Sequence, residues 1–221
     1  MGVDPAKLAE MLCTRLCHDL TGPIGAVNNG AEFLEDEGFD MQNDALQLIL
    51  SSAGEAVSRL MFYRQAYGRT SESGEASLSE KKMLAEAFFK DSKVTLDWPD
   101  HYGDACGVSV SHRGARLLMN FMIIASGAMI RGGTMHVRIE SPEDDVKQLV
   151  IEAEGQTIKL DPSFQAILEG DTSVPLCPKT AQIYLVADLA QEIGATISLS
   201  VAEDRLVLKA EARSVLNAAV G

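Results

Sequence analysis

The stretch Cys17-His18-Asp19-Leu20-Thr21-Gly22-Pro23-Ile24-Gly25-Ala26-Val27 lies in the middle of a long amphipathic pattern. At about 100° per residue, a helix gathers one apolar stripe on a single face, made here of Leu12, Leu16, Leu20, Ile24 and Val27. His18 lies roughly 160° from the nearest leucines of that stripe, so it points away from them. Gly22 and Gly25 fall within roughly 40° of His18, one and two turns further on. We therefore predict an exposed imidazole with no bulk beside it, which another macromolecule can reach.

Around this stretch the sequence predicts a helical hairpin. Asp4-Pro5 is typical of a helix start, and the apolar spacing continues to Leu34, which indicates a helix of about 30 residues. Pro23 lies inside this helix and is expected to kink it. A second pattern with spacings of three and four ends at Gly68 and contains Leu46, Ile49, Ala53, Val57, Leu60, Tyr63 and Tyr67. The connection between the two patterns is short, so we expect the helices to lie antiparallel.

One such hairpin exposes too much apolar surface to stand alone. A second copy would complete a four-helix bundle, which favours a homodimer. The alternative is that the rest of the same chain covers the hairpin.

Composition and charge exclude several classes of protein. The chain has 221 residues and a formal net charge of −13, which argues against nucleic acid as a partner because phosphates would repel it. No apolar run approaches the roughly 20 residues that span a bilayer. The start of the chain lacks the pattern of a secretory signal and that of a myristoylation signal. We therefore expect a cytoplasmic protein that does not bind membranes.

Four cysteines raise the question of a metal site. They are Cys13, Cys17, Cys106 and Cys177. Cys13, Cys17 and His18 would point in different directions from one rigid helix, and the CxxC spacing of zinc and haem motifs is missing. We expect no metal here, and interpret the cysteines as reduced, small hydrophobic residues that flank a helix core.

The remainder of the chain indicates a polar linker at 69–78 and a mixed second domain at 79–221, after a hairpin domain at 1–68. We expect a short helix capped by Ser79, a helix from about 112 to 130 capped by Ser111, and a helix that Pro178 opens. Strands are expected at 94–98, 135–139, 148–153, 196–201 and 206–210. The predicted layering is a set of helices over one face of a largely antiparallel sheet.

The motif His18-Asp19-Leu20-x-x-Pro23-Ile24-x-x-Val27 resembles the H-box of sensor histidine kinases. In that family, the histidine carries a phosphoryl group on a dimeric helical hairpin. The resemblance implies an α+β fold, in which an N-terminal antiparallel hairpin forms a dimeric four-helix bundle. A histidine-kinase ATPase-like α/β sandwich follows the hairpin.

The second domain departs from the kinase pattern at its nucleotide site. Asn120 matches the first of two asparagines in the family's helix, but Ile124 stands at the second, magnesium-binding position. Isoleucine has no oxygen with which to coordinate magnesium. Residues 152–158 replace the family's DxGxG, and the proline-containing segment 174–180 replaces a glycine-rich loop whose N–H groups hold phosphates. We therefore expect a degenerate ATPase-like domain and a protein that is not an ATP-dependent kinase.

The combination of the two domains resembles the ChpT-type histidine phosphotransferases of bacterial phosphorelays. The resemblance implies that His18 accepts a phosphoryl group from the receiver of a hybrid kinase of the CckA type. The histidine would then load response regulators of the CtrA and CpdR type. A non-catalytic scaffold or anti-kinase that binds receivers is the alternative, and an active kinase with an unusual nucleotide site is disfavoured.

Several neighbours of His18 are candidate site residues. Asp19, by analogy with the family's acidic neighbour, would hold one ring nitrogen; the alternative is an ordinary solvated acid. Arg15 lies roughly 60° round the helix and would stabilise phosphoryl charge or meet the receiver, or it is a plain surface arginine. Gly22 and Gly25, with Thr21, would lie where a receiver approaches.

The resemblance also carries implications for the cofactor and for the lifetime of the phosphohistidine. The chain needs no cofactor of its own, because the partner receiver would bring Mg²⁺. The kinase family often has Thr or Asn at the position of Gly22, where it supports hydrolysis, so we expect phosphate on His18 to persist. The remaining histidines, His101, His112 and His136, are expected to have no chemical role.

Overall fold

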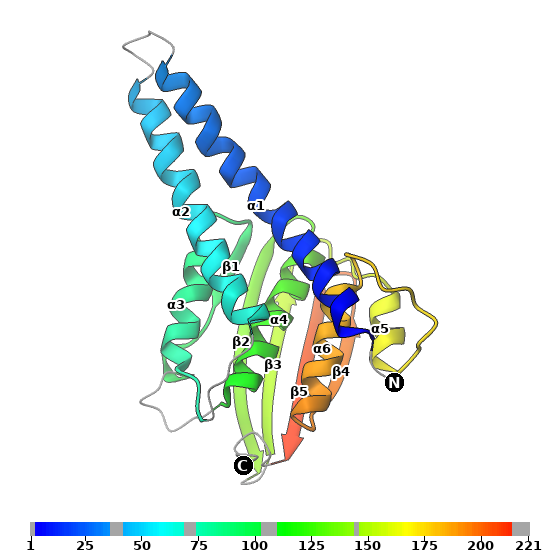
Figure 1. The fold of residues 1–221 in the computed structure, drawn as a ribbon. Coiled ribbons are helices and arrows are strands. Elements are labelled where there is room, and N and C mark those ends of the chain that lie inside the picture. Colours follow the sequence, from blue (N-terminus) through cyan, green and yellow to red (C-terminus); the bar gives the residue numbers. More distant parts are fainter. Residues whose placement is uncertain (1–2, 36–41, 69–73, 103–109, 144–145, 214–221) are drawn as a thin grey trace.

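The computed structural model describes residues 3–35, 42–68, 74–102, 110–143 and 146–213. It has a long helical hairpin that projects from a part built on a sheet (Figure 1). Of the linker predicted at 69–78, residues 69–73 lie outside the described residues. In the described part of the chain, no helix is both long enough and apolar enough to cross a membrane.

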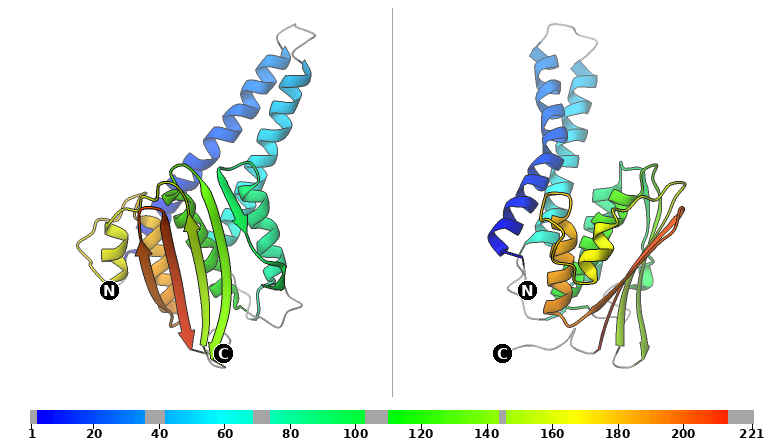
Figure 2. Two further views of the ribbon diagram at one scale, coloured as in Figure 1. Left: turned by 180° about the vertical axis from the view of Figure 1, so that it is seen from behind. Right: turned by 90° about the vertical axis from the view of Figure 1, so that its right-hand side faces the viewer.

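The predicted hairpin is confirmed. It consists of α1 (Pro5–Glu35) and α2 (Gln42–Tyr67). The Asp4 side chain accepts a hydrogen bond from the N–H of Ala6 at 3.0 Å, and α1 continues through Pro23. The helices approach closely at Gly30, where a β-carbon would lie 2.7 Å from Cγ1 of Ile49. Toward its N-terminal end α1 diverges from α2 (Figure 2, right).

The second part has the predicted layering, with helices on one face of a sheet (Figure 2). Its helical segments are α3 (Leu78–Phe89), η1 (Asp100–Tyr102), α4 (His112–Ala128), α5 (Ser163–Leu168) and α6 (Ala181–Glu192). Its strands are β1 (Val94–Asp97), β2 (Gly133–Glu143), β3 (Val146–Glu154), β4 (Thr196–Val201) and β5 (Arg205–Arg213). The sheet order is β1-β2-β3-β5-β4. The β1–β2 pair is parallel and the other pairs are antiparallel.

Three details differ from the sequence prediction. Ser77, not Ser79, caps α3, since its hydroxyl accepts from the N–H of Glu80 at 3.1 Å. The helix expected from Pro178 begins three residues later, at Ala181. The six-residue helix α5 was not expected, because so short a segment shows no periodicity.

The core lies between the sheet and the helices. Most residues of the apolar helix α4 are buried, and the Ser111 hydroxyl caps it by accepting from the N–H of Gly114 at 3.1 Å. The C-terminal end of α2 joins the same core through the fully buried Phe62 and Ala66. The lower end of the hairpin is therefore part of the core of the second domain.

The upper part of the hairpin is not covered. Leu12 and Leu16 pack against the common core, whereas Ile24 is 56% exposed and Leu50 is 58% exposed. The other exposed large apolar side chains of the hairpin are Phe33, Leu34, Leu46, Val57, Leu60 and Met61. The interpretation that the same chain covers the hairpin therefore holds only for its lower end.

Candidate functional site

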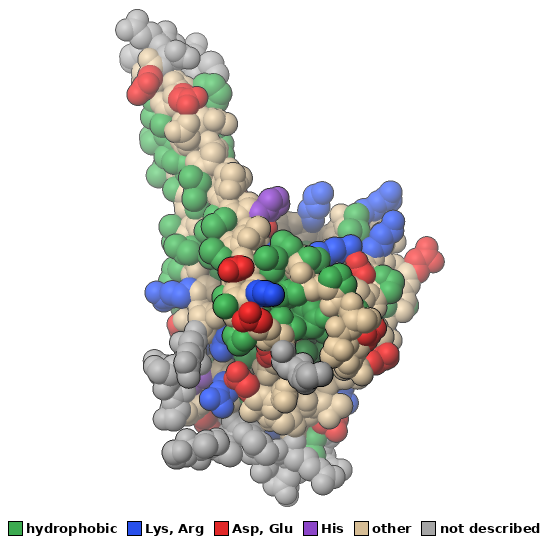
Figure 3. Space-filling view, turned by 45° about the vertical axis from the view of Figure 1, so that its right-hand side comes forward, with side chains coloured by type: hydrophobic (Ala, Val, Ile, Leu, Met, Phe, Trp, Pro, Cys, Tyr) green, Lys and Arg blue, Asp and Glu red, His purple; other side chains and the backbone are tan. Residues whose placement is uncertain are grey.

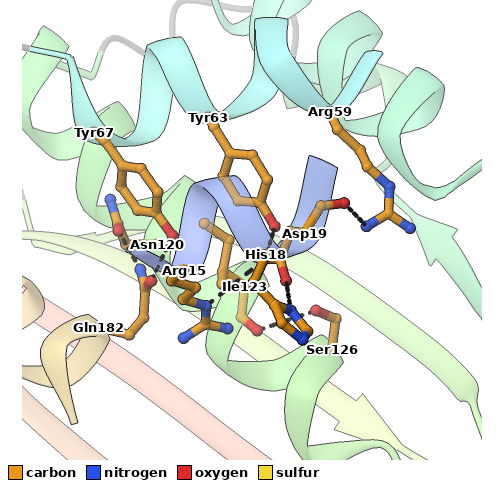
Figure 4. A network of polar contacts seen from close by, with 10 residues as sticks. All are labelled: Arg15, His18, Asp19, Arg59, Tyr63, Tyr67, Asn120, Ile123, Ser126 and Gln182. Atoms are coloured by element: carbon orange, nitrogen blue, oxygen red, sulfur yellow. Dashed lines mark hydrogen bonds and ion pairs between the residues drawn. The ribbon is translucent and has the colours of Figure 1, made fainter. Parts of the chain in front are cut away.

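His18 projects from α1 into solvent, as its helical position predicts. Its side chain is 88% exposed. Nδ1 lies 3.3 Å from Oδ1 of Asp19, which leaves Nε2 on the outer side of the ring (Figure 4). Nothing lies within 4 Å of a β-carbon placed on Gly22 or Gly25. The imidazole is therefore accessible through Nε2, with open space along the helix beyond it.

Asp19 is held in place by groups from both helices of the hairpin. The hydroxyl of Tyr63 donates to Oδ2 at 2.6 Å, and Nε of Arg15 lies 3.9 Å from the same oxygen. Nη1 of Arg59 donates to the main-chain carbonyl of Asp19 at 3.2 Å. The carboxylate is only 23% exposed, so it is not an ordinary solvated acid. Asp19 has a defined orientation toward His18.

The hydroxyl of Tyr63 remains protonated. Burial raises the pKa of Tyr63 far above its ordinary value, and the hydrogen bond and negative charge of Asp19 raise it further. Burial also raises the pKa of Tyr67 to about 12. The hydroxyls of Tyr63 and Tyr67 are therefore both protonated and act as hydrogen-bond donors at neutral pH.

The other predicted neighbours of His18 have different environments. Arg15 is 25% exposed and pairs with Asp19, so it is not a plain surface arginine. The hydroxyl of Thr21 donates to the carbonyl of Cys17 at 2.7 Å, within α1. Its hydrogen-bonding capacity is thus partly used by its own helix.

His18 stands between two hollows. A cavity of about 430 Å³ separates it from the second domain, and its polar rim includes Lys159, Asp161 and Lys179. The cavity floor is apolar and is formed by Ile123, Ile124, Leu160 and Phe164. A second hollow of about 330 Å³ runs along the hairpin beside Gly22, Pro23, Glu55 and Arg59.

The larger cavity is lined by three cations, Arg15, Lys159 and Lys179, and by two carboxylates, Asp19 and Asp161. Nζ of Lys179 lies 2.5 Å from Oδ2 of Asp161, and this contact, together with the hydrogen bonds from Ser163, lowers the pKa of Asp161 to about 2. Figure 3 shows Lys and Arg side chains gathered where the hairpin meets the second domain. Sequence reasoning missed Lys159 and Lys179, which lie in irregular segments far along the chain from His18 and follow no local pattern.

Asn120 has a structural role in this protein. It is fully buried, and its amide donates to the carbonyls of Ala66 at 2.8 Å and Arg116 at 2.7 Å. Its oxygen accepts from the amide of Gln182, whose own oxygen accepts from the hydroxyl of Tyr67 at 2.8 Å (Figure 4). The amide that matches the first asparagine of the kinase pattern therefore ties α2, α4 and α6 together.

Among the described residues, no group of three or more His, Cys, Asp or Glu side chains is arranged to bind a metal ion. Cys13 and Cys17 are exposed, so the interpretation that they flank a helix core is wrong. Cys177 is half-buried, and Cys106 lies outside the described residues.

The fold and the site together define a class of protein. A helical hairpin carries an exposed histidine beside an oriented carboxylate, and its lower end is fused to a five-stranded sheet covered by helices on one face. This is the architecture of a histidine phosphotransfer protein.

Comparison with known proteins places the chain within that class. Residues 78–205 match the family model of the histidine phosphotransferase C-terminal domain. The protein phosphotransferase ChpT of Brucella abortus (strain 2308) is 34% identical over 206 residues, which are 92% of this chain and 95% of that protein. A bacterial phosphotransferase solved at 1.7 Å is 31% identical, with a TM-score of 0.79 over 95% of this chain and 98% of that one. The chain belongs to the histidine phosphotransferase family and is a ChpT-type protein.

Proposed function

We propose that His18 is the residue that carries the phosphoryl group in a phosphorelay. The observation that carries this proposal is the 88% exposed imidazole whose Nδ1 lies 3.3 Å from Oδ1 of Asp19. Neutral imidazole is a good nucleophile near pH 7, because its ordinary pKa is about 6.5. With Nδ1 turned toward the carboxylate, the lone pair of Nε2 faces an incoming partner.

The transfer would proceed from the phosphoaspartate of a docked receiver. The Nε2 lone pair forms the new nitrogen–phosphorus bond, while the bond from phosphorus to the aspartyl oxygen breaks and the carboxylate leaves with that electron pair. The Nδ1 proton stays on the ring, which gains a positive charge that Asp19 stabilises. The reverse reaction loads the next receiver.

The proposed partners are receiver domains. The phosphoryl donor is the receiver of a hybrid kinase of the CckA type, and the acceptors are response regulators of the CtrA and CpdR type. Each receiver would bring the Mg²⁺ that neutralises the transferring group. Around the cavity, the three cations Arg15, Lys159 and Lys179 outnumber the two carboxylates of Asp19 and Asp161. This local excess of positive charge supports the approach of an acidic, phosphorylated partner to a chain whose net charge is −13.

We propose further that the protein does not use ATP. The side chain of Asn120 is fully buried, its amide nitrogen donates to Ala66 and Arg116, and its oxygen accepts from Gln182, so it does not face a solvent-accessible magnesium site. Ile124, at the second asparagine position, is buried and lies in the floor of the cavity. Neither side chain offers magnesium the oxygen ligands that it requires.

The proposed assembly is a homodimer through the hairpin. Eight large apolar side chains on α1 and α2 are exposed, and Figure 3 shows hydrophobic side chains along the hairpin. Pairing with a second hairpin would bury them in a four-helix bundle.

The proposed function is tested by label transfer. The full chain is mixed with a radiolabelled phosphorylated receiver, and the label on each protein is followed with time. We expect transfer to the wild-type protein and to His101→Ala, which alters an exposed histidine of η1, and none to His18→Ala. Transfer to folded His18→Ala would refute the assignment. Receiver binding without transfer to wild-type protein would identify a scaffold instead.

A further inference from the structure

Tyr63 connects the second helix of the hairpin to the proposed phosphoryl acceptor. Its hydroxyl donates to Oδ2 of Asp19 at 2.6 Å, and the other oxygen of that carboxylate lies 3.3 Å from Nδ1 of His18 (Figure 4). The three side chains thus form a line from the buried ring of Tyr63 to the exposed imidazole. Exposure rises along this line, from the buried Tyr63 through the partly exposed Asp19 to the imidazole of His18.

The ring of Tyr63 is itself fixed by packing. It is 4% exposed, stacks on Tyr67 with 5.2 Å between the ring centroids, and meets Phe62 and Phe88 edge to face. A donor on a fixed ring restrains the carboxylate that it binds, just as outer groups orient the ligands of a metal site. The hydroxyl stays a donor because burial and Asp19 raise its pKa.

The other groups around Asp19 do not provide the same restraint. Nε of Arg15 lies 3.9 Å from Oδ2, which is beyond hydrogen-bond distance. Arg59 donates to the main-chain carbonyl and leaves the carboxylate free to rotate. The hydroxyl of Tyr63 is therefore the short contact that sets the direction of the carboxylate.

We propose that Tyr63 is a positioning residue for phosphoryl transfer, which holds Oδ2 of Asp19 so that Oδ1 accepts the Nδ1 proton of His18. This keeps the imidazole in the tautomer whose bare nitrogen is Nε2, the atom that faces solvent. The inference rests on the proposed function of His18 as the phosphoryl acceptor. It adds a residue on α2 to a site that the motif places on α1 alone.

The chain offers a matched control for this role. Tyr67 lies one turn after Tyr63, and its hydroxyl donates to Gln182 instead of Asp19. Tyr63→Phe and Tyr67→Phe each remove one hydroxyl and keep the ring, so both should preserve the aromatic packing. The thermal midpoints of the two variants show whether they fold equally well.

The first measurement is the tautomer of His18 in the unphosphorylated full chain, from ¹⁵N NMR of the imidazole. We expect the proton on Nδ1 in the wild-type protein and in Tyr67→Phe. In Tyr63→Phe we expect part of the population to move to the tautomer with the proton on Nε2. A wild-type protein with the proton on Nε2 would overturn the proposal, whether or not the variants fold.

The second measurement is the rate of transfer from a phosphorylated receiver. We expect Tyr63→Phe to be slower by about tenfold, the usual effect of one hydrogen bond to a charged group, and Tyr67→Phe to be within about twofold of wild type. A Tyr63→Phe protein with the wild-type rate, or with a slow rate and the wild-type tautomer, would overturn the proposal. The tautomer is measured without phosphate, so it tests the role of Tyr63 independently of phosphoryl transfer. If His18→Ala still accepted the label, the proposed function would fail, whatever the tautomer measurement shows.

Discussion

Replacing Asn120 with alanine tests whether the hydrogen bonds of this buried amide stabilise the packing of α2, α4 and α6. The substitution removes the donor of the Ala66 carbonyl and the acceptor of the Gln182 amide, both in buried surroundings. The carbonyl of Arg116 lies in the same helix and keeps its helical partner. A buried polar group left without a partner costs about 1–3 kcal/mol, so two of them predict a loss of about 3 kcal/mol in the free energy of unfolding.

The assay is urea denaturation followed by far-UV circular dichroism, together with thermal unfolding. For a chain of this size, a loss of about 3 kcal/mol corresponds to a fall of about 6–12 °C in the thermal midpoint. Asn28→Ala is the control, because Asn28 is exposed and donates only to Glu32 within α1. We expect it to change the free energy of unfolding by less than about 0.5 kcal/mol.

Two results would refute this reasoning. One is an Asn120→Ala protein as stable as the wild type, which would mean that the amide does not satisfy the buried groups. The other is a thermal midpoint of the wild-type protein that rises with MgATP and a midpoint of Asn120→Ala that does not. That outcome would show that Asn120 serves a nucleotide site.

Three other predictions concern the sheet, the phosphohistidine and the tyrosines. Glu152 is buried and pairs with Arg138 at 2.9 Å and with Arg205. Breaking a fully buried ion pair costs about 3–5 kcal/mol, and the cost is lower here because these arginines are partly exposed. Glu152→Ala should therefore lower the free energy of unfolding, measured in urea, by about 2 kcal/mol. The purified phosphorylated protein should keep its label, because Gly22 offers no side chain to assist hydrolysis, and the label is measured against time in the absence of any receiver. The free energy of unfolding should fall as the pH rises above 10.0, because the unfolded chain then releases tyrosine protons that the raised pKa values of Tyr63 and Tyr67 retain in the folded state.

Each of these predictions has a control or a contrary outcome. Glu154→Ala alters an exposed neighbour on the same strand and should have a smaller effect than Glu152→Ala. Rapid loss of label from the isolated protein would show that another group assists hydrolysis. In Tyr63→Phe the alkaline loss of stability should be smaller, and an unchanged pH profile would contradict the burial argument.

The helices of the hairpin and most of the sheet were predictable from local patterns. Apolar spacing and the Asp4-Pro5 start determine α1, and alternation determines β2 from Met135 onward. These patterns are local because each helix or strand buries one face. The apolar residues of that face recur at the spacing of the helix or strand, so they can be recognised within a short stretch of sequence. The start of α6 was predicted three residues too early, since Pro178 lies in a turn before the helix.

The candidate site was predictable only where it lies on one helix. His18, Asp19 and Arg15 share α1, so helical angles bring them together. Tyr63 fits the apolar pattern of α2, and nothing in that pattern distinguishes a hydroxyl bound to Asp19 from a core ring. Lys159 and Lys179 reach the cavity only through the packing of the second domain against α1. Tertiary packing, which local spacing does not encode, supplies these residues.

Among the residues that the structure describes, the groups that orient Asp19 toward His18 lie on the same helical hairpin as His18. Asp19, Arg15, Arg59 and Tyr63 belong to the hairpin of a single polypeptide, and the lysines of the cavity rim follow in the same polypeptide. We predict that, in the pair proposed above, each subunit carries its phosphoryl group independently of the other. A mixed assembly of wild-type and His18→Ala chains should carry phosphate in proportion to its wild-type chains. A defective subunit would then lower the total amount of phosphate carried without inactivating the wild-type subunit paired with it.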